Sequence, residues 1–80
     1  MNKNQILEEV QEIFRDVLDN EEIVLNENTV ADDVEGWDSL AHVQLVSEIQ
    51  KKFGIKFSAK EMISWDTVGD MCKTIQSKLS

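Results

Sequence analysis

The 80-residue sequence predicts an all-α protein, a four-helix bundle with three longer helices, one short helix and a long loop between the first two. Apolar residues recur at helical spacing in three stretches, and no two apolar runs of matching strength could pair as strands. Helices with one apolar face each bury that face only by packing around a common core. Because a chain of this size has enough surface for one core, we expect residues 1–80 to form a single domain.

The first helix has the most regular pattern in the chain. Its apolar residues form one continuous face: Ile6, Leu7, Val10, Ile13, Phe14, Val17 and Leu18. The opposite face carries mostly acidic residues, as a solvated helix surface would. We therefore predict an amphipathic helix that begins near the N-terminus and packs on the core.

Residues 20–36 show no sustained period, which predicts a long connecting loop. Ile23, Leu25 and Val30 are the apolar residues expected to hold this loop against the core. A short strand over residues 23–25 is an alternative, although the sequence offers no second strand to pair with it.

A second helical pattern follows Gly36, and its predicted apolar face contains Leu40, Val43, Val46, Ile49 and Phe53. Gly54 is expected to end this helix, because glycine is common just beyond a helix C-terminus. Ser58 is expected to cap a short helix over residues 59–63.

The last predicted helix begins at Asp66 or Thr67, because both side chains are good helix caps. Its apolar face contains Val68, Met71, Cys72, Ile75 and Leu79. Cys72 is the only cysteine, so no internal disulfide can form, and we expect it to be a buried apolar residue.

The composition excludes several classes of protein. With 41% hydrophobic and 30% charged residues, the chain has the composition of a soluble globular protein. It has no apolar run long enough for membrane insertion and no export signal, so a cytoplasmic location is expected. The net charge of −8 argues against nucleic-acid binding and favours partners with basic surfaces.

The charge is unevenly distributed along the chain. Residues 1–38 contain twelve acids and two bases, whereas residues 39–80 contain four acids and six bases. The acids between residues 16 and 38 do not match the ligand spacing of a calcium-binding loop, so no metal site is predicted.

A serine at the predicted start of the second helix is the strongest candidate for function. Asp38 is expected to cap the helix, which leaves the hydroxyl of Ser39 free at the first helical position. A phosphate attached there would lie where free backbone N–H groups and the helix dipole favour an anion. An ordinary surface serine is the alternative that these residues alone leave open.

A small hydrolase that uses Ser39 and His42 is another alternative. The two residues are three positions apart and could share a helix face. The sequence contains no G-x-S-x-G turn and no second histidine, so this alternative is disfavoured and His42 is expected to be exposed or to face a partner.

The stretch GWDSLAHVQLVSEIQKKFGIKF, followed by a short element and WDTVGDM, resembles the acyl carrier protein family of phosphopantetheine-attachment domains. The resemblance implies that Ser39 receives 4'-phosphopantetheine from a phosphopantetheinyl transferase that uses magnesium and coenzyme A. It also implies that acyl groups are held on the arm as thioesters. The flanking Asp38 and Leu40 match positions that engage the transferase and partner enzymes.

The same resemblance implies a monomeric carrier that is not itself an enzyme. Its partners would be acyl-loading and acyl-transferring enzymes with basic surfaces. In carriers of fatty acid biosynthesis the second helix is densely acidic, whereas residues 39–53 here contain one acid, Glu48, beside Lys51 and Lys52. This difference favours a dedicated carrier for specialised acyl transfer, such as polyketide, other natural-product or surface-polymer assembly.

Two alternatives remain open at this point. One is a peptidyl or aminoacyl carrier of the same fold, and the other is a helical protein-interaction module without a prosthetic group. Trp37 and Trp65 are expected to be packing residues. The other interpretation of Trp65 is that it lines a groove for the carried chain, with Met62, Ile63 and Met71 as neighbours.

Overall fold

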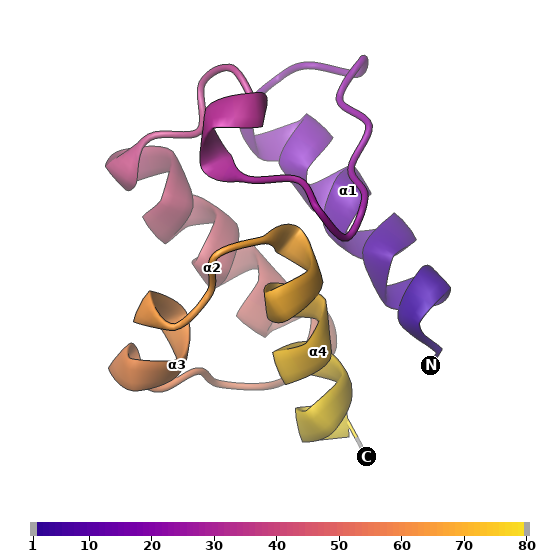
Figure 1. Ribbon diagram of the computed structural model, residues 1–80, viewed down its shortest axis with the longest axis vertical. Coiled ribbons are helices and arrows are strands. Elements are labelled where there is room, and N and C mark those ends of the chain that lie inside the picture. The colour runs from indigo at the N-terminus through magenta and orange to yellow at the C-terminus, as the bar shows by residue number, and fades with distance from the viewer. Residues whose placement is uncertain (1, 80) are drawn as a thin grey trace.

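The computed structural model describes residues 2–79, and the helices in this range confirm the predicted all-α four-helix bundle (Figure 1). They are α1 (Lys3–Val17), α2 (Ser39–Phe53), α3 (Ala59–Ile63) and α4 (Val68–Leu79). A short 3₁₀ helix, η1 (Ala31–Asp33), lies in the long loop and was not predicted. None of the helices in this range is long and apolar enough to cross a membrane.

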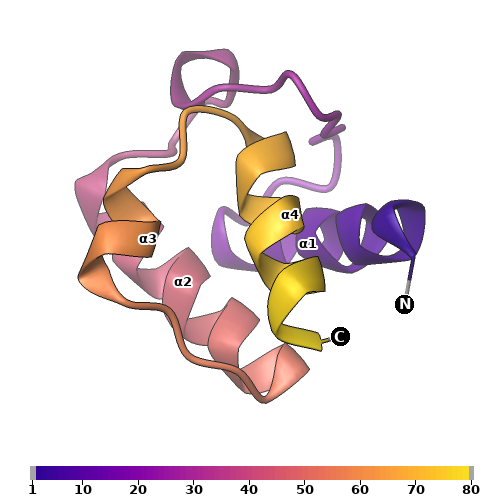
Figure 2. The same cartoon turned by 60° about the horizontal axis from the view of Figure 1, so that its bottom comes forward.

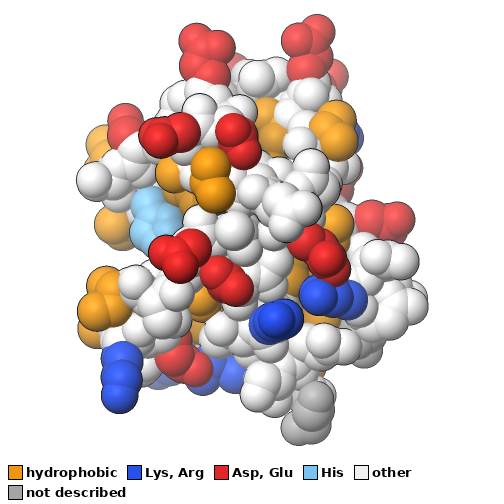
Figure 3. Space-filling view, in the orientation of Figure 1, with side chains coloured by type: hydrophobic (Ala, Val, Ile, Leu, Met, Phe, Trp, Pro, Cys, Tyr) orange, Lys and Arg blue, Asp and Glu red, His pale blue; other side chains and the backbone are white. Residues whose placement is uncertain are grey.

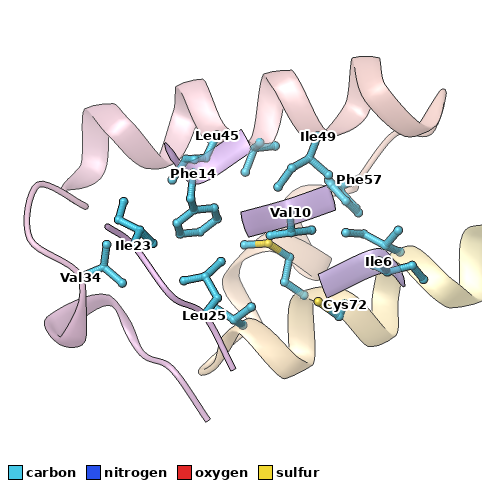
Figure 4. Packing of buried hydrophobic residues seen from close by; sticks show 14 residues of the cluster. Ile6, Val10, Phe14, Ile23, Leu25, Val34, Leu45, Ile49, Phe57 and Cys72 are labelled. Carbon is cyan, nitrogen blue, oxygen red and sulfur yellow. The ribbon is translucent and has the colours of Figure 1, made fainter. Parts of the chain in front are cut away.

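Helix α1 is the centre of the packing, because it contacts both α2 and α4 (Figures 1 and 2). Its side chains Ile6, Val10 and Phe14 have no exposed surface. Figure 4 shows them pointing toward apolar residues of the other helices and of the loop. The core also contains Cys72, which is buried as predicted.

The long loop is attached to the core through Ile23 and Leu25, as predicted, while Val30 is only half-buried. The alternative of a strand at residues 23–25 is wrong, since the segment has no strand pairing in the described chain. Side chains of α1 bond this backbone instead. The Gln11 Oε1 atom accepts the Leu25 N–H at 2.9 Å, and the Arg15 Nε–H donates to the Ile23 carbonyl at 2.9 Å.

The middle of the loop is bonded to the start of α4. The Val68 N–H donates to the Thr29 carbonyl at 2.8 Å, and the Gly69 N–H donates to the Glu27 carbonyl at 3.0 Å. The loop therefore satisfies backbone donors that a helix start leaves free. A Cβ atom at position 69 would lie 2.6 Å from the Glu27 carbonyl oxygen, so only glycine allows this approach.

The predicted apolar face of α2 was partly wrong. Its buried residues are Ala41, Leu45, Val46 and Ile49, whereas Leu40 and Val43 are 71% and 65% exposed. Ala41, Leu45 and Ile49 form one row at four-residue spacing that faces α1. At 3.6 residues per turn, positions 40 and 43 point roughly 150° away from Leu45. The sequence contains apolar residues on both sides, and packing selects one of them.

Three predicted helix boundaries are confirmed, namely the C-terminus of α2 and the N-termini of α3 and α4. Gly54 caps α2 in the left-handed conformation, with φ of 65°. Ser58 caps α3 by accepting the Glu61 N–H at 3.1 Å. The Thr67 hydroxyl accepts the Asp70 N–H at the start of α4 at 3.2 Å.

Candidate functional site

The N-terminus of α2 is built around Asp38. Its backbone is extended, and its Oδ1 atom accepts the Ala41 N–H at 2.8 Å, which is the predicted helix cap. Its carbonyl accepts the His42 N–H at 2.8 Å, which forms the first helical bond. The cap therefore fixes the direction in which residues 39–42 leave the loop.

Ser39 is the first residue of α2, and its side chain is exposed. Within residues 2–79 its hydroxyl makes no hydrogen bond. Leu40, the next residue, is also exposed, so the structure brings the three predicted site residues together at one exposed helix start. The site presents an accessible alcohol beside an acidic cap and an apolar side chain.

A groove of about 590 Å³ begins at Ser39. Trp37 and His42 form one side of it, and Met62 and Ile63 of α3 form another. Ala31, Trp65 and Met71 complete its apolar lining. The groove therefore contains all four residues of the groove interpretation: Trp65, Met62, Ile63 and Met71. It opens at the candidate serine.

The two tryptophans also pack, as predicted. Trp37 makes an edge contact with Phe14, with ring centroids 4.8 Å apart, and Trp65 makes one with Phe57 at the same separation. The Trp65 Nε1–H donates to the Thr74 hydroxyl at 2.9 Å. Trp65 therefore fits both interpretations, since it packs on Phe57 and also lines the groove.

His42 is half-buried, so the prediction of an exposed side chain was wrong, while its alternative, a side chain that faces a partner, stays a prediction. It lies between the tryptophans: its ring centroid is 6.0 Å from that of Trp37 and 6.3 Å from that of Trp65. The Trp37 Nε1–H donates to its Nδ1 at 3.1 Å. Burial lowers the pKa of His42 below its ordinary value. This cluster was not predicted, because only the shared helix face of Ser39 and His42 follows from sequence spacing, whereas the tryptophan contacts depend on tertiary packing.

The described residues do not show the contacts of the serine–histidine alternative. No hydrogen bond joins Ser39 and His42 in residues 2–79, and Trp37 occupies the nitrogen that a carboxylate would have to orient. In the same residues, no group of three or more His, Cys, Asp or Glu side chains is placed to hold a metal ion.

Charge is segregated around the site. In Figure 3 acidic side chains gather over the loop end of the molecule, and basic ones lie toward the opposite end. Two lysines near the end of α2 are paired with acids: Lys51 Nζ lies 3.7 Å from a Glu48 oxygen, and Lys52 Nζ lies 3.2 Å from a Glu9 oxygen. The start of α2 therefore faces solvent beside the acidic loop. Near the C-terminal end of α2 the positive and negative charges nearly cancel.

Comparison with known proteins defines the class. Residues 8–75 match the family model described as phosphopantetheine attachment site, and the chain belongs to this family. It is 37% identical to an acyl carrier protein from Exiguobacterium sp. over 99% of this chain and 100% of that protein. It is 33% identical to one from Thermosynechococcus vestitus over 100% of this chain and 99% of that protein.

A solved structure gives the same result. The solution structure of the holo acyl carrier protein from Geobacter metallireducens matches with a TM-score of 0.87 and 36% identity. The match covers 92% of this chain and 85% of that one. The protein described here therefore carries acyl groups on a phosphopantetheine arm.

The residues at the start of α2 fit such an arm. A phosphodiester needs an accessible hydroxyl, and an anion is favoured at a helix N-terminus, where the backbone N–H groups of the first turn point outward. The arm supplies a thiol on a long flexible chain, to which acyl groups are joined as thioesters. At the start of α2 the protein offers the exposed hydroxyl of Ser39 and a groove beside it.

Proposed function

We propose that Ser39 bears the 4'-phosphopantetheine arm of this acyl carrier. The observation that carries the proposal is the exposed hydroxyl of Ser39, which has no hydrogen-bond partner in the described chain and lies at the start of α2 beside an open groove. A modifying enzyme can reach this oxygen without unfolding any part of the bundle. The assignment also agrees with the position of D-S-L in the family pattern.

Asp38 and Leu40 are the flanking recognition residues in this proposal. The Oδ1 atom of Asp38 caps the helix, and the same carboxylate adds negative charge where a transferase approaches. Leu40 offers an exposed aliphatic side chain, and Val43 extends it along the same side of α2. Together they form an apolar contact surface next to the attachment point.

The partners are a phosphopantetheinyl transferase and the enzymes that load and remove acyl groups. Basic surfaces on these enzymes complement the acidic loop that leads to Ser39, and such complementarity speeds encounter without tight binding. We infer that the protein acts as a single-domain monomer in the cytoplasm. The chemistry of transfer belongs to the partner enzymes, and the carrier itself is not a catalyst.

The charge of α2 supports a specialised pathway over general fatty acid synthesis. The helix has one acid, Glu48, whose oxygen lies 3.7 Å from the Lys51 ammonium group, so a basic partner patch finds no free row of acids there. A dedicated loading enzyme for a polyketide, surface-polymer or other specialised acyl group is the expected partner. An aminoacyl loading enzyme is the alternative within the same fold.

Intact-protein mass spectrometry tests the attachment residue. The purified apo-protein is incubated with coenzyme A, magnesium and a promiscuous phosphopantetheinyl transferase. Wild type should gain the mass of one phosphopantetheine, and Ser39→Ala should gain none. Ser47→Ala is the matched control, because Ser47 is another exposed serine of α2, and it should be modified like wild type. Modification of Ser39→Ala, or no modification of wild type, overturns the proposal.

A further inference from the structure

Ser39 and His42 share one face of α2 and line the same groove. Residues three apart on a helix have Cβ atoms about 5–6 Å from each other. A group attached to the Ser39 oxygen therefore begins within reach of the His42 ring. Figure 3 shows the single histidine of the chain reaching the surface, next to hydrophobic and acidic side chains.

The hydrogen bond from Trp37 sets the tautomer of His42. An indole nitrogen can only donate, so the Nδ1 atom that receives the Trp37 bond carries no proton. The proton of the neutral ring is then on Nε2. The two neighbouring tryptophan rings restrict rotation of the imidazole, so this N–H points in a defined direction.

The Nε2–H of His42 has no acceptor in the described part of the chain, where the only hydrogen bond of the ring is the one to Trp37. Every fully buried side-chain nitrogen or oxygen in the same residues has a partner. Nε2 is therefore accessible from the groove. The structure holds an oriented donor without a protein acceptor, three residues after the candidate attachment point.

We propose that His42 is a positioning residue for the arm, with its Nε2–H donating a hydrogen bond to the phosphodiester on Ser39. This inference rests on the proposed attachment at Ser39. The bond directs the arm from Ser39 across the His42 ring toward Trp65 and Met71, so the arm enters the groove and does not extend freely into solvent. A neutral histidine can do this without forming a strong ion pair, so the arm remains free to leave for a partner enzyme.

The charges around the groove favour this assignment. Asp38 and Asp66 are its acidic lining residues, and the residues contributed by α3, Met62 and Ile63, are uncharged. Apart from the Thr67 hydroxyl, which caps α4 by accepting the Asp70 N–H, His42 is the lining side chain nearest in sequence to Ser39 that can offer a phosphodiester a donor not already bonded within the described chain. Burial lowers the His42 pKa in the protein without the arm, and a nearby anion would raise it again.

Nuclear magnetic resonance tests the proposal directly, because the chain has one histidine and the arm has one phosphorus atom. The His42 ring signals are titrated in the apo- and holo-proteins, and the ³¹P signal is followed over the same pH range. We expect attachment of the arm to raise the His42 pKa by roughly half a unit or more. A phosphodiester does not titrate near neutral pH, so its ³¹P signal should follow the protonation of His42 with the same midpoint.

Two variants separate positioning from a structural role. In holo His42→Phe the pH-dependent inflection of the ³¹P signal should vanish, and because Asp38 and Asp66 remain, its loss is due to the histidine. Contacts between arm protons and the Trp65 ring should also be lost. His42→Gln keeps an N–H donor, so it should retain those contacts while the ³¹P signal becomes independent of pH. If the phenylalanine variant does not fold, the glutamine variant alone still tests the donor.

The outcomes separate this inference from the attachment proposal. Mass spectrometry first establishes that the arm is on Ser39, and its absence there defeats the attachment proposal. If the arm is present but the His42 pKa is the same with and without it, and the ³¹P signal is flat, the positioning role of His42 is wrong while Ser39 remains the attachment residue.

Discussion

The apolar residues of α1 and α4 differ sharply from those around the start of α2 and on α3. Phe14 and Ile75 are completely buried, whereas Leu40, Val43 and Ile63 are between 65% and 83% exposed. Apolar side chains of similar size therefore have two roles here. Those on the α1–α4 side hold the fold together, and those beside Ser39 remain available for contact with other molecules.

The difference follows from how each element is held. Helix α1 contacts two long helices through one apolar face. Helix α3 has five residues, none of them fully buried. Its contacts are the partial packing of Met62 on the core, the Ser58 cap, and the ion pair between Lys78 and Glu61, 3.0 Å apart. Such a short helix forms only because the rest of the protein holds it. The groove next to Ser39 thus has one firm wall, α2, and one weakly held wall, α3.

The largest effect is expected from Phe14→Ala on the buried side. Its side chain has no exposed surface and contacts the Trp37 ring, so truncation should lower the free energy of unfolding by about 3–5 kcal/mol. Urea denaturation measures this change. Ile63→Ala on the exposed side is the control and should change stability by less than about 0.5 kcal/mol. Similar losses in the two variants would contradict the comparison.

The next effect concerns the close approach between the loop and α4. Gly69→Ala places a Cβ atom 2.6 Å from the Glu27 carbonyl oxygen, so the loop must move. We expect a loss of roughly 1–3 kcal/mol, the usual range for overpacking. Ser77→Ala, at an exposed position of the same helix, serves as the control in thermal melts. Unchanged stability of Gly69→Ala would mean that this contact is not maintained in solution.

A smaller effect, on function and not on stability, is expected from Leu40→Ala. The residue is 71% exposed, so the free energy of unfolding should stay within about 0.5 kcal/mol of wild type. Loading by the phosphopantetheinyl transferase should lose about tenfold in kcat/KM, since full burial of a leucine side chain is worth about 1.5–3 kcal/mol and about 1.4 kcal/mol is a factor of ten. Gln44→Ala, also exposed on α2, is the control in the same kinetic assay. Equal kcat/KM values for the two variants would remove Leu40 from the contact surface.

The smallest expected effect is the pH dependence caused by His42. Because burial lowers its pKa in the folded protein, folding favours the neutral ring. This contribution is complete above the unfolded value of 6.5 and is lost as pH falls below it. Wild-type apo-protein should therefore lose stability relative to His42→Phe between neutral and mildly acidic pH.

Thermal melts of the two proteins at several pH values measure that difference. Backbone hydrogen bonds also lower the pKa values of Glu61 and Asp70, so acid weakens both proteins, and only the difference between them reports on His42. A difference that does not vary with pH would show that the groove does not desolvate the ring.

Features set by local residues were predictable, and features set by long-range contacts were not. The caps at Asp38 and Ser58 and the stop at Gly54 depend on neighbouring residues, and all three were predicted. The orientation of α2 was not, because apolar residues occur on two sides of the helix and only its packing on α1 separates them.

The same distinction holds for the loop and the site. Gln11 bonds backbone fourteen residues away, which leaves no signature in a single sequence. The exposed helix-start serine was predicted from its local pattern. The bond between Trp37 and His42 was not, since it depends on how the loop turns before α2.

The burial of Cys72 gives the carrier a chemical advantage. Burial raises the pKa of its thiol to about 11, so almost none of it is ionised near neutral pH, and the thiolate is the reactive form. An acyl group that arrives as a thioester therefore has a single nucleophilic sulfur available, the one at the end of the arm. Burial therefore disfavours both transfer of cargo to the polypeptide's own cysteine and cross-linking of two carriers through it.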